Sequence, residues 1–167
     1  MIVVLNGSVG VGKTSVAWAL NECFDTSVML DGDYLGAVHP FRLYDAARVT
    51  YLYQTLAHLV SFHQKHGYTN FVVNYVFESP ESLSELVGYL RPTDGDIRTF
   101  WLMCSEDEQR RRILERKTDQ WAWELERFTE LNAILEAASE HGDIGARVDT
   151  TDKSVAEIVE AIGYCLA

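Results

Sequence analysis

Positive charge is scarce in this chain of 167 residues, which has 14 Lys and Arg but 25 Asp and Glu, so that the formal net charge is −11. A large surface for nucleic acid is therefore not expected, because phosphate binding needs a basic field. Long apolar runs are also missing, since no uncharged stretch approaches the about 18 residues of a membrane span. The first residues, "MIVVL", are too short for a signal segment and lack its basic flank. We expect a cytoplasmic protein that binds neither nucleic acid nor membranes.

Cysteine is also rare, and its spacing does not suggest a metal site. The three cysteines, Cys23, Cys104 and Cys165, are odd in number and lack metal-ligand spacing. Buried free thiols in a reducing compartment are the simplest interpretation. Internal repeats and low-complexity linkers are absent, and the length favours one domain. We expect residues 1–167 to form a single domain, while a monomer and a homodimer both remain open.

Apolar segments alternate with helical patterns along the chain. The β-branched run at the N-terminus is typical of a buried parallel strand. Helix starts carry capping signals: Ser79 precedes a proline, and Ser105 and Ser154 each stand three residues before a glutamate. Strands that alternate with helices predict an α/β domain with a parallel sheet. Strands are predicted over 1–6, 27–31, 70–77, 97–104 and 145–150, and helices from about 13 and over 44–66, 79–90, 105–116, 119–141 and 155–166.

The segment "GSVGVGKTS" matches the pattern of a phosphate-binding loop between a strand and a helix. Its glycines let the backbone curl so that successive N–H groups point at phosphate oxygens. Lys13 supplies a cation for the β- and γ-phosphates, and Thr14 offers a hydroxyl to Mg²⁺. The following helix adds the positive end of its dipole. Nucleotide binding is therefore predicted for Gly7, Ser8, Val9, Gly10, Val11, Gly12, Lys13, Thr14 and Ser15.

Two aspartates in "LDGD" close the second predicted strand. Asp31 and Asp33 should therefore lie at the carboxyl edge of the sheet, where open α/β sheets bind ligands. Carboxylates there can hold Mg²⁺ through waters and can take a proton from an acceptor hydroxyl. An ordinary Asp-Gly turn is the alternative interpretation. No Asn-Lys-x-Asp segment for guanine is present, so a GTPase is not expected.

Arginines gather on the helix predicted over 105–116. Arg112 and Arg116 are four residues apart and share one helix face. Phosphoryl transfer needs cations to offset charge, and arginine also stacks on adenine. The alternative is a solvated basic face paired with neighbouring glutamates. Arg127 is a candidate for a second cation of a lid.

Taken together, these motifs resemble the small P-loop kinases of the shikimate kinase, gluconate kinase, adenylylsulfate kinase and chloramphenicol phosphotransferase-like group. The similarity rests on "GSVGVGKTS", "LDGD", the pair Arg112 and Arg116, and the late "VDTTDKSVAEIVEAI", in this order. It implies a three-layer P-loop fold with a five-stranded parallel sheet of order 2-3-1-4-5. It also implies ATP as donor, Mg²⁺ as cofactor, and a mobile helical lid near 117–127.

The resemblance also implies roles for single residues. Arg116 would lie near the adenine, and the segment 150–154, which includes Thr151, would approach the base through its backbone. Asp33 would contact the acceptor hydroxyl and Asp31 would support Mg²⁺, although the two aspartates could exchange these roles. The chain departs from shikimate kinases after the third strand, where "NYVFESPES" replaces a Gly-Gly-Gly segment. Its lid sequence "TDQWAWELER" does not match the cationic lid of a nucleoside monophosphate kinase.

Candidates for the acceptor side lie just beyond the aspartates. Arg42 in "HPFRLYD" could bind an anionic substrate group, or could simply pair with Asp45 at the surface. We expect ATP-dependent transfer of the γ-phosphate to a hydroxyl of a small-molecule acceptor. A nucleotide or nucleoside kinase is one alternative, and a nucleotide-binding regulatory module without phosphotransfer is another. The same pocket could be lined by Tyr34, His39, Tyr75, Phe77 and Glu78.

Overall fold

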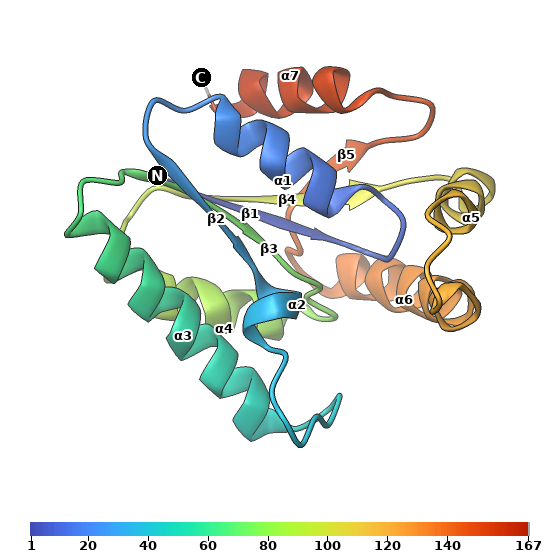
Figure 1. The fold of residues 1–167 in the computed structure, drawn as a ribbon, viewed down its shortest axis with the longest axis horizontal. Helices are drawn as coiled ribbons and strands as arrows, with labels where there is room; N and C mark the ends of the chain where they lie inside the picture. Colours follow the sequence, from blue (N-terminus) through green and yellow to red (C-terminus); the bar gives the residue numbers. More distant parts are fainter. Residues whose placement is uncertain (167) are drawn as a thin grey trace.

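A five-stranded parallel sheet forms the centre of the computed structural model, which describes residues 1–166 (Figure 1). The strand order β2-β3-β1-β4-β5 confirms the expected α/β fold and its sheet topology. β1 is buried along its whole length and pairs with β3 and β4. In this register Val4 lies beside Val73 of β3 and Thr99 of β4. The strands are β1 (Ile2–Gly7), β2 (Ser27–Asp31), β3 (Asn70–Asn74), β4 (Ile97–Met103) and β5 (Ala146–Asp149).

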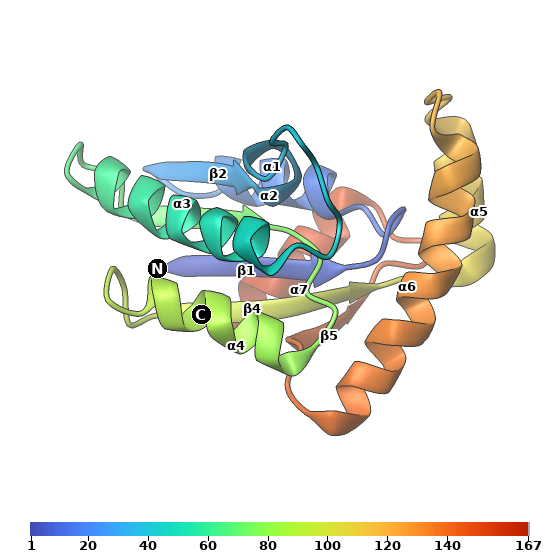
Figure 2. The same cartoon turned by 90° about the horizontal axis from the view of Figure 1, so that it is seen from below.

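Helices cover both faces of the sheet and its carboxyl end (Figures 1 and 2). Helices α1 (Lys13–Glu22) and α7 (Val155–Leu166) cover one face, and α3 (Ala46–Gln64) and α4 (Pro80–Leu90) cover the other. The short α2 (Gly32–Leu35) follows β2 directly, and α5 (Glu106–Glu115) and α6 (Trp121–His141) stand beyond the carboxyl end of β4. No helix within residues 1–166 is long and apolar enough to cross a membrane.

Alternating residues of β1 divide the core into two layers. Ile2 and Val4 pack toward α3 and α4, whereas Val3 and Leu5 pack toward α1 and α7. This arrangement follows from the pleat, because successive side chains of a strand point to opposite faces. A parallel sheet covered on both sides needs apolar residues at every position of its central strand, which explains the continuous run "IVVL".

The capping residues that the sequence indicates are confirmed. The hydroxyl of Ser79 accepts a hydrogen bond from Ser82 N at 3.2 Å, and that of Ser105 accepts one from Glu108 N at 3.4 Å. Ser154 and Glu157 cap one another reciprocally before α7. These side chains satisfy N–H groups that the first turn of a helix leaves unpaired.

Two expectations need correction. β3 ends at Asn74 and not at residue 77, because the chain beyond it is bonded to the side chain of Asn6. Asn6 Oδ1 accepts from Phe77 N at 2.9 Å, and its Nδ2 donates to Phe77 O at 3.2 Å. The three cysteines are free thiols, but Cys23 and Cys165 are exposed and not buried.

Candidate active site

The glycine loop between β1 and α1 adopts a backbone that only glycine takes without strain. Gly7 has φ 149°, and a Cβ there would lie 2.6 Å from the carbonyl oxygen of Leu102. Gly12, with φ 96°, directly precedes α1 in a left-handed conformation. Within the described residues no side chain caps α1. The first N–H groups of this helix therefore remain available to an anion.

Lys13 is the buried cation of the loop. Its side chain is 8% exposed, and Nζ donates to the carbonyl oxygen of Ser8 at 3.0 Å. Burial lowers the pKa of Lys13 to about 8; Asp33 and Asp31 oppose this shift, while Arg116 adds to it. The fold has therefore brought Lys13, Asp31, Asp33 and Arg116 into one electrostatic cluster, although they are far apart in sequence.

Asp31 organises the carboxyl ends of β2 and β3. Its Oδ1 accepts from Asp33 N at 2.9 Å and so begins α2, which holds Asp33 in the first turn. Its Oδ2 accepts from Asn74 Nδ2 at 2.8 Å, and this Nδ2 lies 3.5 Å from Thr14 Oγ1. The contact follows from the sheet register, in which Asp31 and Asn74 are paired. Asn74 is 1% exposed, and its Oδ1 has no hydrogen-bond partner among residues 1–166.

This group of oxygen atoms fits a magnesium ion that is bound together with a phosphate. Mg²⁺ prefers oxygen ligands and keeps several waters, so it needs only one or two protein groups beside the phosphates. The hydroxyl of Thr14 and the carboxylate of Asp31 supply such groups, and Asn74 Nδ2 contacts both. No three His, Cys, Asp or Glu residues of the described chain gather as a metal cage. The fit is therefore to a shared site and not to a protein-only site.

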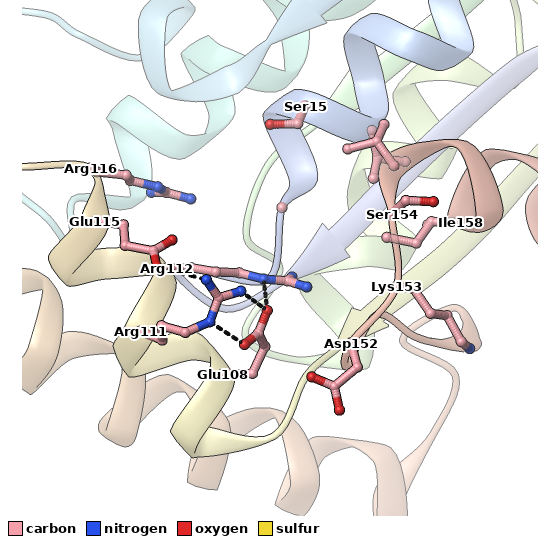
Figure 3. Close-up of a pocket in the computed structure, with 13 residues that line it drawn as sticks. Ser15, Glu108, Arg111, Arg112, Glu115, Arg116, Asp152, Lys153, Ser154 and Ile158 are labelled. Carbon is pink, nitrogen blue, oxygen red and sulfur yellow. Dashed lines mark hydrogen bonds and ion pairs between the residues drawn. The ribbon is translucent and has the colours of Figure 1, made fainter.

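Two cavities meet at the glycine loop. The wide cavity, of about 690 Å³, lies between the start of α1, helix α5 and the segment 152–155 (Figure 3). The inner cavity, of about 390 Å³, is lined by Lys13, Thr14 and Asp33. Both are lined by Gly12 and Arg116, so the loop separates two spaces that adjoin.

The paired arginines of α5 occupy different places. Arg112 donates to Glu108 Oε1 at 2.8 Å, to Thr150 O at 2.8 Å and to Val11 O at 3.3 Å, and it lines the wide cavity (Figure 3). It thereby joins α5 to the glycine loop and to the end of β5. Arg116 follows the last turn of α5, lines both cavities, and has no ion pair within residues 1–166. Arg116 is therefore free to act between the two spaces.

Asp33, Tyr75 and Glu78, three of the residues predicted for the acceptor side, line the inner cavity together. Although Asp33 is accessible from the cavity, the surrounding walls desolvate its carboxyl group and raise its pKa above the ordinary value. Lys13 and Arg48 oppose this shift, and Asp31 adds to it. A carboxylate with a raised pKa beside a cation is suited to accept a proton from a bound hydroxyl.

Several predicted residues lie elsewhere. Tyr34 is 81% exposed, Arg42 and His39 are exposed as well, and none of them lines either cavity. Phe77 belongs to the core beside α3 and α4. The hydroxyl of Thr151 contacts Asp149 and Ser105 N, while the next residues, 152–155, line the wide cavity.

The arginine that the fold buries near the acceptor side is Arg48, which we did not predict. It is 7% exposed and donates to Arg42 O at 3.1 Å and to Leu43 O at 3.0 Å, and its guanidinium lies 4.7 Å from the ring centre of Phe41. The loop before α3 therefore wraps around it. A signal was present in the sequence, because Arg48 occupies the same i, i+4 register as the buried residues of α3, namely Leu52, Leu56 and Val60.

Arg127, the candidate lid cation, is also buried and is hydrogen-bonded to three side chains. It is 7% exposed, pairs with Glu78, and donates to Glu130 Oε2 at 2.5 Å and to Tyr44 OH at 3.2 Å. These contacts join α6 to the segments that follow α2 and β3. Arg127 lines the inner cavity, where Glu78 neutralises its charge.

Comparison with known proteins shows the fold. No protein-family model and no curated protein sequence matches the chain. A sugar kinase from Janibacter sp. HTCC2649 superposes with TM-score 0.71 and 13% identity, over 99% of this chain and 93% of that one. The Deinococcus radiodurans tunicamycin resistance protein gives TM-score 0.69 and 16% identity, over 99% and 95%. A gluconokinase from Sinorhizobium meliloti 1021 gives TM-score 0.60 and 20% identity, over 95% and 86%. The expected likeness to small P-loop kinases is thus confirmed for the fold.

Proposed function

We propose that the chain is an ATP- and Mg²⁺-dependent kinase that transfers the γ-phosphoryl group to a hydroxyl of a small molecule. The observation that carries this proposal is the pair of cavities that meet at Gly12 and Arg116, with Asp33 lining only the inner one. A phosphoryl donor in the wide cavity and an acceptor in the inner cavity would meet beside Lys13. Two adjoining spaces on either side of a phosphate loop are what a transfer reaction requires.

The donor half consists of the wide cavity and the loop. The base of ATP would lie between Arg112 and the segment 152–155, and the phosphates would run along the loop toward Lys13. Because Arg112 is tied to backbone carbonyls beside the wide cavity, we assign it to the base. Arg116 lines both cavities, and we assign it to the transferring phosphoryl group, which reverses the expected division between the two arginines.

Magnesium, when bound with the nucleotide, neutralises charge on the phosphates and helps to align them. The residues that would hold it are Thr14 and Asp31, and Asn74 Nδ2 donates to Asp31 Oδ2 and lies 3.5 Å from Thr14 Oγ1. The chain's own contribution is to keep these groups fixed at the ends of β2 and β3, next to the loop. Lys13 would hold the phosphate oxygens from the other side.

The acceptor half is organised by Asp33. As the acceptor hydroxyl oxygen forms a bond to the γ-phosphorus, the bond from that phosphorus to the β–γ bridging oxygen breaks and ADP leaves. The hydroxyl proton passes to Asp33 and from there to solvent. The raised pKa of Asp33 makes it a better proton acceptor than an ordinary carboxylate. Asp31, which caps α2, positions Asp33 and does not take the proton.

The segment 117–127 would serve as the lid. Gln120, Trp123, Glu124 and Arg127 from this segment line the inner cavity, so a small closing movement would reduce the access of water. Exclusion of water favours transfer to the acceptor over hydrolysis of ATP.

ADP release across a broad panel of hydroxyl compounds tests the proposal. The wild-type chain should release ADP in the presence of a suitable acceptor. The Lys13→Ala variant should release none with any acceptor of the panel. A nucleotide-binding module without phosphotransfer would bind ATP and release no ADP with any acceptor. In that case the inner cavity and Asp33 would have no catalytic use, and Asp33→Asn would change neither binding nor turnover.

A further inference from the structure

The inner cavity continues into a third space between α3 and α4. This outer cavity, of about 460 Å³, is lined by Arg48 and Tyr53 of α3 and by Glu81 and Glu85 of α4. It shares four lining residues with the inner cavity, among them Tyr75 and Glu78, so the two spaces adjoin. An acceptor whose hydroxyl meets Asp33 would extend its remaining groups toward the outer cavity. The chemistry of these walls therefore bears on the acceptor.

Two arginines of these walls, Arg48 and Arg127, are already bound to the chain itself. Arg48 directs its donors to the carbonyl oxygens of Arg42 and Leu43, and Arg127 directs its donors to Glu78, Glu130 and Tyr44. Arg48 and Arg127 are each 7% exposed. A carboxylate or phosphate of an acceptor that approached Arg48 or Arg127 would compete with these partners, which makes an anionic group unfavourable at this end of the cavities.

Three carboxylates of the same walls have no cationic partner within residues 1–166, although that of Glu81 accepts hydrogen bonds from its own N–H and from Ser79, which hold its pKa below the ordinary value. Among the described residues, no Lys, Arg or His forms an ion pair with Glu81, Glu85 or Glu124. Glu81 and Glu85 are one helical turn apart on α4, where like charges repel and a bound cation would relieve the repulsion. Together the two cavities are lined by five carboxylates and four cations. Lys13 and Arg116 are assigned to the phosphates and Asp33 to the acceptor hydroxyl, so that four carboxylates and two guanidinium groups remain for the other groups of the acceptor.

One carboxylate oxygen has no hydrogen-bond donor at all. Glu124 lines the inner cavity, and its Oε1 accepts from Thr118 Oγ1 at 3.3 Å. Its Oε2 is buried and has no partner within residues 1–166. A buried charged oxygen without a donor is costly, and a ligand that brings an N–H group would satisfy it.

Aromatic rings complete the walls. Tyr75 lines both cavities, Trp123 lines the inner one, and Tyr44 and Tyr53 line the outer one. Ring faces attract cations and also pack against the C–H groups of a polyol. Tyr53 OH and Ser82 Oγ lie 2.7 Å apart and offer further hydroxyl contacts at the outer end.

We infer, as an extension of the proposed kinase function, that the acceptor is a small alcohol that carries a protonated amine, which Glu124 and the pair Glu81 and Glu85 recognise. The hydroxyl would meet Asp33, and the amine would lie toward these carboxylates. Alcohols that carry a carboxylate or phosphate instead are disfavoured acceptors.

Matched sets of compounds test this inference. Each set has one carbon skeleton and differs in one group, such as D-glucosamine, D-glucose and D-glucuronate, or ethanolamine, ethylene glycol and glycolate. Binding is measured by calorimetry in the presence of ADP and Mg²⁺, so that it does not depend on turnover. ADP release from ATP is measured separately with the same compounds. In at least one set we expect the amine to bind about tenfold or more tightly than its neutral partner, as one charge-assisted hydrogen bond allows.

Glu124→Gln should abolish the preference for the amine, and Glu85→Gln, on the exposed surface of α4, should reduce it. Glu126→Gln is the matched control, because Glu126 is exposed on the same helix and lines neither cavity. The inference is overturned when no set shows amine-dependent binding, when the anionic members bind best, or when Glu126→Gln acts as strongly as Glu124→Gln. Amine binding without ADP release would refute the proposed kinase function but support the amine site. ADP release with equal use of all members of a set would support the kinase function but refute the amine site.

Discussion

The proton on Lys13 should be coupled to nucleotide binding. Burial lowers the pKa of this ammonium to about 8 in the free chain. Phosphate oxygens beside Nζ would favour the charged form, so the pKa is higher in the complex than in the free protein. Nucleotide binding therefore takes up a proton near and above pH 8, and affinity falls as the pH rises through this value.

The size of the effect follows from the fraction of Lys13 that is charged. With a pKa of about 8, this fraction is roughly 0.8 at pH 7.5 and roughly 0.1 at pH 9. If only the ammonium form binds, the affinity for ADP falls about eightfold between these two pH values. Without burial the side chain would stay charged over the whole range, and the affinity would not change.

Calorimetry of Mg²⁺-ADP binding measures both the affinity and the proton uptake, in buffers that differ in their enthalpy of protonation. Lys13→Arg is the control, because arginine remains charged and its binding should be independent of pH. A wild-type affinity that stays constant from pH 7.5 to pH 9, without proton uptake, would refute the account of Lys13.

Three further predictions concern single side chains. Asp33→Asn should lower kcat by about 10²–10⁴-fold and leave the KM for ATP nearly unchanged, because Asp33 lines only the acceptor side. Arg112→Met should mainly raise the KM for ATP, and Arg116→Met should mainly lower kcat, as steady-state kinetics will show. Arg127→Met should lower the free energy of unfolding by about 2 kcal/mol, less than the about 3–5 kcal/mol of a fully buried pair, because Glu78 is 30% exposed. In the same denaturation experiment, Arg98→Met should cost less than about 1 kcal/mol, because its ion pair is half exposed.

Each of these predictions has an outcome that would contradict it. A large change in the KM for ATP with Asp33→Asn would place this residue on the donor side. Equal kinetic effects of the two α5 substitutions would remove the division of roles between Arg112 and Arg116. Equal losses of stability for Arg127→Met and Arg98→Met would mean that the buried network contributes no more than a surface pair.

Local patterns predicted most of the fold. Apolar runs marked all five strands, and serine caps marked the starts of three helices, because these signals act between residues close in sequence. The end of β3 was predicted too late, since the bonds that end it come from Asn6, across the sheet. The strand order depends on contacts between distant segments, and only the resemblance to known kinases predicted it.

The parts of the candidate site that are formed by residues close together in sequence could be predicted. The glycine loop acts through its own backbone, and Asp31 and Asp33 follow directly from the end of a strand. On the acceptor side the directions of side chains depend on packing. Arg42 is exposed and lines neither cavity, while the loop before α3 folds around Arg48, and the sequence alone does not distinguish the two arginines.

The central claim is that the chain moves a phosphoryl group from ATP to a hydroxyl, and following that group is the most direct test. ATP labelled in its γ-phosphoryl group is incubated with the wild-type chain, Mg²⁺ and the acceptor that most stimulates ADP release, and the products are separated and identified by mass spectrometry. The account predicts label in a phosphate ester of the acceptor, lost with Lys13→Ala and strongly reduced with Asp33→Asn. Label that remains in ATP, or that appears only as inorganic phosphate, would contradict it.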